Sequence, residues 1–246
     1  NYSPSRTDRF GWERHNMPGL VRYLLEKGAR TEARIRYSLA YHHDPFVARS
    51  TEDPPQVDPV GATPLLLAGV SGDIESMKIL LDHGADAKAK TAGGATLFLL
   101  AAGLGAERGT RNQKQAIEAA EFALQAGGGD VNDYLTERAV DGPGANQPDG
   151  RTALHAAVLH GWRDMIRFLV DKGADVEARD RYGMTPMLYA LGDPKGLYYR
   201  QIGSGNYDIR YRRPRNEGEG ENDISRLLAE LGAETYTGSY RDRSGE

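Results

Sequence analysis

The clearest pattern of apolar and polar positions lies in residues 149–181. Between residues 163 and 171 apolar residues recur at three- and four-residue spacing, which predicts a helix whose buried face holds Met165, Ile166, Leu169 and Val170. Residues 153–159 are small or apolar, and Thr152 and Gly161 are suited to begin and end a short helix there. Gly173 ends the second helix in the same way. The stretch therefore predicts two short helices joined by a tight turn and followed by a hairpin.

Similar stretches recur along the chain. Glycines open them at positions 61, 94, 150 and 183, so the first and third intervals are equal and the middle one is longer. The excess length of the middle interval is divided between a loop at 106–112, before a second helix predicted over 113–125, and a loop at 132–148. Stacked repeats accept insertions at such turns because the core is not disturbed there.

The residues TALH at 152–155 and GADVEAR at 173–179 resemble the TPLH and GADVNA motifs of ankyrin repeats. The two equal intervals also match the ankyrin period of about 33 residues. The resemblance implies an all-α ankyrin-repeat solenoid of about five helix-turn-helix repeats, the first of them partial, with long inserted loops. The expected repeats lie near 16–58, 61–92, 93–148, 149–181 and 182–234, after an N-terminal arm over 1–15 and before a C-terminal tail over 235–246.

The likeness is greatest to bacterial ankyrin-repeat proteins with long insertions. Many of those are exported, which favours a periplasmic or extracellular location over a cytoplasmic one.

The first and last repeats depart from the pattern. The first shows only a second helix after Asn16, with one apolar face made of Leu20, Val21, Leu24 and Leu25, and its first helix is missing or degenerate. Together with the start of the chain at Asn1 rather than Met, this indicates a mature or partial chain. The fifth has helices near 183–192 and 222–233. Between them lies an insertion rich in tyrosine and arginine, in which we find no sustained helical or alternating pattern.

Composition excludes several classes of function. The 246 residues contain no cysteine, which excludes disulfides, cysteine nucleophiles and thiolate metal sites. A formal charge of −4 provides no overall attraction to nucleic acid or to acidic lipid. The longest nearly uncharged apolar run, residues 93–106, is too short to span a bilayer.

Candidate catalytic or metal-binding groups are few. By resemblance, His155 is a structural residue that ties neighbouring turns together through hydrogen bonds. The adjacent His42 and His43 would point to opposite sides of an extended segment, so they do not favour a metal site. The glycines at 127–129 and at 203 and 205 are not followed by the lysine and hydroxyl of a phosphate loop. We therefore predict no catalytic residue, no metal, no cofactor and no enzymatic activity.

The predicted function is a protein-protein interaction module that uses its concave face, hairpin tips and inserted loops. The resemblance places tip residues at Val60, Ala62, Arg151, Arg181, Tyr182 and Met184, and helix-end contacts at Val70, Leu159 and His160; a contact role and a plain surface role stay open for His160. In the insertion, the candidates are Tyr198, Tyr199, Tyr207, Arg210, Tyr211, Arg212 and Arg213. Such a mixture can bind an acidic protein face or nucleic acid, or can be a solvated loop; a protein partner is favoured over nucleic acid.

Two other functions stay open at this point. One is a structural subunit clamped into a larger assembly by its long loops, and the other is a hydrolase or metal enzyme built inside the insertions. Because the fifth-repeat insertion has little apolar surface to offset its ordering entropy, we predict that a partner orders it rather than its own core.

Overall fold

The computed structural model describes residues 17–36, 57, 60–106, 111–136, 150–180, 183–191 and 223–235, and the backbone of 197–201 and 207–211. The described helices are α1 Met17–Glu26, α2 Pro64–Ser71, α3 Ile74–Asp82, α4 Leu97–Ala101, α5 Gln113–Gln125, α6 Ala153–His160, α7 Arg163–Asp171, α8 Pro186–Leu191 and α9 Asp223–Glu230. A β-hairpin of β1 Leu197–Gln201 and β2 Tyr207–Tyr211 lies between α8 and α9.

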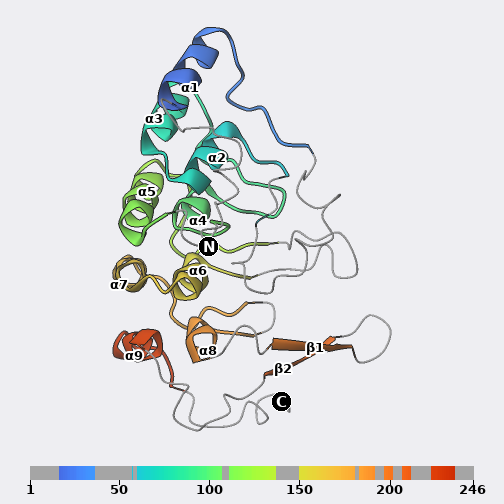
Figure 1. The fold of residues 1–246 in the computed structure, drawn as a ribbon, viewed down its shortest axis with the longest axis vertical. Coiled ribbons are helices and arrows are strands. Elements are labelled where there is room, and N and C mark those ends of the chain that lie inside the picture. The colour runs from blue at the N-terminus through green and yellow to red at the C-terminus, as the bar shows by residue number, and fades with distance from the viewer. Residues whose placement is uncertain are drawn as a thin grey trace, which may run out of the picture.

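The helices form two columns (Figure 1). The first helices of successive repeats, α2, α4, α6 and α8, form one column, and the second helices, α3, α5, α7 and α9, form the other. Each of these first helices packs against the second helix of its own repeat. One continuous apolar cluster runs through the stack from Ala62 to Ala233, and α5 contributes only alanines to its fully buried part. The predicted all-helical solenoid is thereby confirmed.

The second helices end at a common signal. A glycine with positive φ follows two residues after the end of α1, α3, α5, α7 and α9, at Gly28, Gly84, Gly127, Gly173 and Gly232. Their φ values, between 72° and 98°, are in the left-handed region that glycine adopts without steric cost. These five glycines provide a common reference for comparing equivalent positions in the repeats.

The first helices begin at threonines. The Oγ1 atoms of Thr63, Thr96 and Thr185 accept hydrogen bonds from the backbone N–H three residues later, at distances of 3.3–3.4 Å. Each bond satisfies one of the donors that a helix start leaves without a partner. The capping predicted for Thr152 takes another form, because there the third residue is His155.

The His155 imidazole joins the fourth and fifth repeats. The backbone N–H of Thr152 donates to its Nδ1 at 3.2 Å, and its Nε2 lies 3.0 Å from the carbonyl oxygen of Met184. Because a backbone N–H can only donate and a carbonyl can only accept, the proton must be on Nε2 and the ring must be neutral. The ring is fully buried and lies edge-on to Tyr189. The predicted structural role of His155 is confirmed.

Two insertions leave the stack at hydrogen-bonded hairpins. Ile35 N–H donates to the Ala62 carbonyl at 3.1 Å and Gly61 N–H donates to the Ile35 carbonyl at 2.8 Å. Leu135 makes the same pair of bonds with Arg151 and Gly150, at 3.0 and 2.8 Å. The two ends of each insertion therefore lie side by side, so the length of the insertion does not affect the register of the stack.

Side chains from one hairpin also cap the next. Glu32 Oε1 accepts from Asp86 N–H at 3.0 Å, and Glu177 Oε1 accepts from Glu234 N–H at 2.7 Å. Asn132 Oδ1 likewise accepts from Asp175 N–H at 2.8 Å. These side chains all lie four or five residues after a terminal glycine, so the contact repeats along the stack and fixes the offset between neighbouring repeats.

Two sequence expectations need correction. The apolar face expected on α1 is split, because Val21 and Leu25 pack against the core while Leu20 and Leu24 are 48 % and 46 % exposed. The fifth-repeat insertion, in which no alternating pattern was expected, contains the β1–β2 hairpin. Residues 207–211, YDIRY, do alternate, but tyrosine is both aromatic and polar and hides the period.

Candidate interaction surface

The predicted tip residues divide into two groups. Ala62 and Met184 are 3 % and 5 % exposed, and their carbonyl oxygens accept hydrogen bonds inside the stack, so they cannot offer side chains to a partner. The expectation for these two residues was wrong, because a tip residue that turns inward closes the hairpin. Val60 and Arg151 are half-buried, whereas Arg181 and Tyr182 lie outside the described residues.

The helix-end candidates Val70, Leu159 and His160 are half-buried. His160 is used within the chain: its ring stacks on Trp162 with 4.1 Å between centroids, and its Nε2 lies 3.1 Å from the Gly103 carbonyl oxygen. Trp162 in turn lies so close to Gly103 that any side chain there would overlap the indole. His160 therefore joins the third and fourth repeats.

The middle of the first-helix column is closed. Every residue of α4 is at most 1 % exposed, and residues 153–158 of α6 are at most 7 % exposed. In an open solenoid these helices would line the accessible concave wall. Val57, from the first insertion, lies against Gly105 just beyond α4, where an added Cβ would be 3.0 Å from its Cγ2. Among the described residues of the first-helix column, the large apolar side chain that stays exposed is that of Leu67 on α2, at 44 %.

Arg111 closes the joint between the second and third repeats. Its Nη1 donates to the carbonyl oxygens of Gly69, Val70 and Leu100 at 3.1–3.3 Å, and its Nη2 donates to that of Ala101 at 2.6 Å. The side chain is buried, and burial lowers its pKa to about 10, so it is charged at neutral pH. The sequence analysis did not predict a role for Arg111. The only local feature that marks it is its position immediately before Asn112, the N-cap residue of α5.

The acceptors of Arg111 explain how a charge is held there without a described carboxylate. They lie in the last turns of α2 and α4, where the helix itself leaves carbonyl groups without donors; those of Gly69 and Leu100 also accept from the N–H groups of Gly72 and Gly103. Each helix end carries roughly half a negative charge, so two ends together balance one guanidinium. Arg111 is therefore a shared C-terminal cap.

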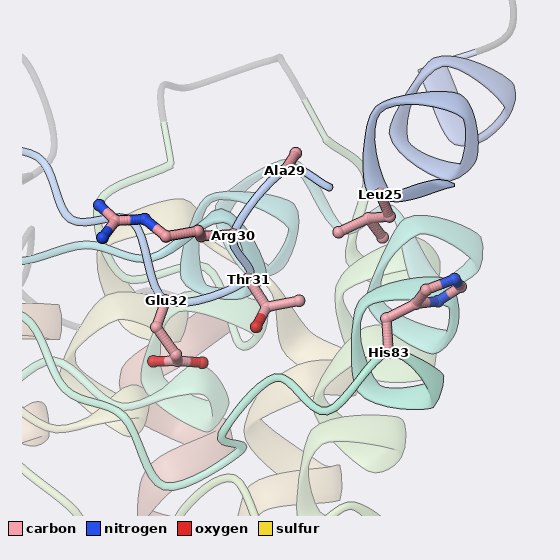
Figure 2. A pocket seen from close by; sticks show the side chains of 6 residues that line it. All are labelled: Leu25, Ala29, Arg30, Thr31, Glu32 and His83. Carbon is pink, nitrogen blue, oxygen red and sulfur yellow. The ribbon is translucent and has the colours of Figure 1, made fainter. Parts of the chain in front are cut away.

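A shallow pocket of about 350 Å³ lies between the first two repeats (Figure 2). Leu25 and His83 lie on one side of it, and the guanidinium of Arg30 points away from both. His83 Nδ1 lies 2.7 Å from the Ile79 carbonyl, to which it must donate, and Glu32 is already bound to Asp86 N–H. Two of its polar side chains are thus engaged in the fold, and its volume is suited to a single protein side chain.

The register of the β-hairpin separates its residues into two faces. Leu197 pairs with Tyr211, Tyr199 with Ile209 and Gln201 with Tyr207, which places five apolar or aromatic residues and one glutamine on one face. The pairs Tyr198 with Arg210 and Arg200 with Asp208 share the other face. The insertion candidates therefore do not form one surface: Tyr199, Tyr207 and Tyr211 lie on the apolar face, and Tyr198 and Arg210 on the charged face. Arg212 and Arg213 lie outside the described residues.

Candidate metal ligands and candidate membrane spans can be sought in the described part of the chain. Within it, no three histidine, aspartate or glutamate side chains come together as metal ligands, and no helix is long and apolar enough to cross a membrane. The fragment His42-His43-Asp44 and the glycines at 203 and 205 lie outside the described residues. Gly127 is a helix stop with φ of 72°, as its place in the repeat predicts.

Comparison with known proteins adds the family. A model for three copies of ankyrin repeats matches residues 112–197, and a model for a single ankyrin repeat matches residues 60–92. The chain is 44 % identical to the serine/threonine-protein kinase VIK of Arabidopsis thaliana over 24 % of this chain and 16 % of the kinase. It is 35 % identical to the putative ankyrin repeat protein FPV223 of fowlpox virus over 28 % of this chain and 49 % of the relative.

A longer match is to the ankyrin repeat protein nuc-2 of Neurospora crassa, 32 % identical over 68 % of this chain and 14 % of the relative. The chain thus spans less than half of the length of each of these relatives, and the kinase match is partial. These relatives are eukaryotic and viral, so the expected bacterial likeness stays a prediction. The repeat motifs, the two columns of helices and the matching models together show that the chain is an ankyrin-repeat protein.

Proposed function

We propose that this chain is a non-enzymatic protein-interaction module and that it binds a protein partner through the apolar face of the β1–β2 hairpin. Ankyrin repeats are protein-interaction modules, which supports the general role. The choice of the hairpin as the binding surface rests on the pairing register of its strands. That register places Leu197, Tyr199, Tyr207, Ile209 and Tyr211 on one face of a two-stranded sheet. Tyrosine is enriched at protein interfaces because it contributes a large rigid area at a low entropic cost.

The packing of the hairpin supports a partner. The main contacts of each strand are with the other strand, and the hairpin extends from the α8 side of the stack, away from the second-helix column (Figure 1). A two-stranded sheet is marginally stable in water unless one of its faces is covered. A partner that covers the apolar face supplies this stabilisation, and the charged face, with Arg200, Asp208 and Arg210, then remains toward solvent.

The test compares two cross-strand pairs of opposite faces. In one variant Tyr199→Ser and Ile209→Ser remove apolar area from one face, and in the control Arg200→Ser and Asp208→Ser change the other face. Each variant, and a deletion of residues 195–219 closed by a Gly/Ser turn, is used as bait in the native extract, and captured proteins are quantified by mass spectrometry. A protein captured by wild type and by the control, but lost from the apolar-face variant and the deletion, is then titrated in purified form. Equal affinity for both double variants would refute the proposal.

Stoichiometry separates this function from that of a structural subunit. A module that binds reversibly is recovered in free and bound forms, whereas a subunit clamped into an assembly is recovered at a fixed ratio to its neighbours. Analytical ultracentrifugation of the native complex at increasing dilution measures this difference. Dissociation on dilution supports the module, and a particle that stays intact supports the subunit.

A further inference from the structure

The hairpins that join the first three repeats carry an excess of positive charge. Five basic and two acidic side chains lie on the described strands of these two hairpins, a net charge of +3; the strands are residues 28–36, 60–62 and 84–95. All five basic side chains are exposed: Arg30, Arg34, Arg36, Lys88 and Lys90. These five side chains define the basic hairpin pair.

The next two hairpins have the opposite charge. Five acidic and two basic side chains lie on their described strands, a net charge of −3; the strands are residues 127–136, 150–152, 173–180 and 183–185. The charge along the hairpin edge of the stack therefore changes sign between the second and third hairpins. A partner segment of one charge is attracted to one half of this edge and repelled by the other half.

The two basic hairpins form one continuous surface. The strand at 60–62 lies between them, because it is joined by backbone hydrogen bonds to Ile35 on one side and to Ala92 on the other. Arg34 links the hairpins directly, since its Nη1 donates to a carbonyl oxygen of this strand at 2.9 Å and to that of Lys90 at 3.0 Å. The guanidinium of Arg34 is thereby held beside the backbone of the second hairpin.

The basic hairpin pair has unused capacity to bind carboxylates. Within the described part of the chain, none of its five side chains forms an ion pair. Both acids nearby are bound to the backbone: Glu32 Oε1 accepts from Asp86 N–H, and Asp86 Oδ1 accepts from Lys88 N–H at 2.9 Å. In the described contacts of Arg34 only Nη1 takes part, so Nε and Nη2 remain for a ligand. A planar carboxylate matches the two N–H groups of that edge.

We infer that the basic hairpin pair binds an extended acidic segment of a protein partner. One carboxylate of the segment pairs with Nε and Nη2 of Arg34, and its neighbours reach Lys88 and Lys90. The acidic third and fourth hairpins confine the segment to the first two. A protein segment is favoured over single-stranded nucleic acid because residues 28–36, 60–62 and 84–95 include no aromatic side chain on which a base could stack.

The probe is a fluorescein-labelled peptide of about 12 residues in which glutamate alternates with glycine or serine, and which extends over about 40 Å. Its control peptide carries lysine in place of glutamate. Binding to the full chain is measured by fluorescence anisotropy at low ionic strength, because salt screens contacts between exposed charges. The acidic peptide should bind and the basic one should not bind at this surface.

Paired charge removals locate the binding surface. Lys88→Ser with Lys90→Ser should weaken binding of the acidic peptide by about tenfold, since two exposed ion pairs are lost. This variant keeps the Arg34 link, which uses the backbone carbonyl of Lys90. The control, Arg167→Ser with Arg226→Ser, removes the same charge from the second-helix column and should leave the affinity unchanged.

A second matched pair tests the guanidinium. Arg34→Lys keeps the charge but loses the two-pronged edge, so it should weaken binding by about threefold. Arg179 is the control because its Nη1 donates in the same way, at 3.1 Å, to the carbonyl of Gly183, the glycine that opens the next repeat. It lies on an acidic hairpin, so Arg179→Lys should have no effect. Equal effects of the two lysine variants would contradict the assignment of Arg34.

Each remaining outcome overturns the inference. An equal loss of affinity in the two serine double variants shows general charge attraction. Tighter binding of a single-stranded DNA of the same charge identifies nucleic acid as the ligand. A dimer in light scattering that Lys88→Ser with Lys90→Ser abolishes identifies a second copy, bound through its acidic hairpins. A tenfold gain on changing Glu52 and Asp53 to serine shows that the chain's own insertion occupies the surface.

This surface is independent of the proposed function. It lies on the first two hairpins of the stack, whereas the β1–β2 hairpin lies between α8 and α9 (Figure 1). Deletion of residues 195–219 should therefore leave binding of the acidic peptide unchanged. A failure of the β1–β2 proposal is then distinguishable from a failure at the basic hairpin pair.

Discussion

Replacing Arg111 with methionine removes the shared cap at the joint of the second and third repeats while it keeps much of the side-chain volume. The guanidinium makes four hydrogen bonds to carbonyl oxygens of α2 and α4 and their ends. A hydrogen bond to a charged group contributes about 1.5 to 3 kcal/mol, so the four together contribute on the order of 6 to 12 kcal/mol. Methionine replaces none of them.

Burial opposes this gain. Burial lowers the Arg111 pKa to about 10, and this lowering corresponds to about 3 kcal/mol of lost hydration. Methionine avoids that cost and keeps part of the apolar contact, but it removes the donor to the carbonyl groups of Val70 and Ala101, whereas those of Gly69 and Leu100 keep their backbone donors. We therefore expect the free energy of unfolding to fall by about 3 to 5 kcal/mol, as on removing one member of a buried charged network.

Urea denaturation followed by circular dichroism measures this change. The control is Arg167→Met, because the Arg167 side chain is 48 % exposed and its nearest carboxylate, on Glu230, is 4.0 Å away, so the expected loss is below about 1 kcal/mol. The loss at Arg111 should be constant between about pH 6 and pH 9, since the guanidinium stays protonated in both the folded and the unfolded chain across that range. A loss below about 1 kcal/mol, or one equal to that of the control, would refute the capping account.

Two further predictions concern the repeats themselves. Leu154→Ala should lower the free energy of unfolding by about 2 to 5 kcal/mol because Leu154 is 1 % exposed and leaves a cavity, whereas Leu67→Ala should cost less than about 1 kcal/mol; thermal melts that coincide for the two variants would show the packing to be misassigned. Gly84 and Gly94 have φ values of 84° and 79°, but a Cβ meets nothing at Gly84 and overlaps the Thr136 side chain at Gly94. Alanine should therefore cost about 1 kcal/mol at Gly84 and clearly more at Gly94, as measured by urea denaturation.

Helix boundaries could be predicted because local residues encode them. The expected second helices at 163–171 and 113–125 coincide with α7 and α5, since a terminal glycine and an apolar stripe mark each of them. The role of His155 was also accessible, because the repeat motif specifies which neighbouring carbonyl its ring must reach. Such features depend on residues within one repeat or on its nearest neighbour.

Contacts that depend on absent or distant elements could not be predicted. The apolar pattern of α1 does not show which of its leucines are covered, because that depends on whether a first helix is present. The acceptors of Arg111 include Gly69, which is far from it along the chain, and no local pattern links a loop arginine to them. In the insertion, tyrosines at 198 and 199 fall on opposite faces, so that only the pairing register shows which of them belongs with the apolar residues.

The insertions help to close the middle of the solenoid. A concave wall binds partners only when its first helices are accessible, and here α4 is buried and most of α6 is buried with it. Side chains from two insertions contribute to this joint: Val57 lies against Gly105, and Arg111 caps α2 and α4. Such contacts stabilise the centre of the stack, but they also remove the surface that an uninterrupted array would use. Among the described residues, the large apolar side chains that stay exposed are Leu20, Tyr23 and Leu24 on α1, Leu67 on α2 and Tyr134, so they lie outside the closed joint between α4 and α6.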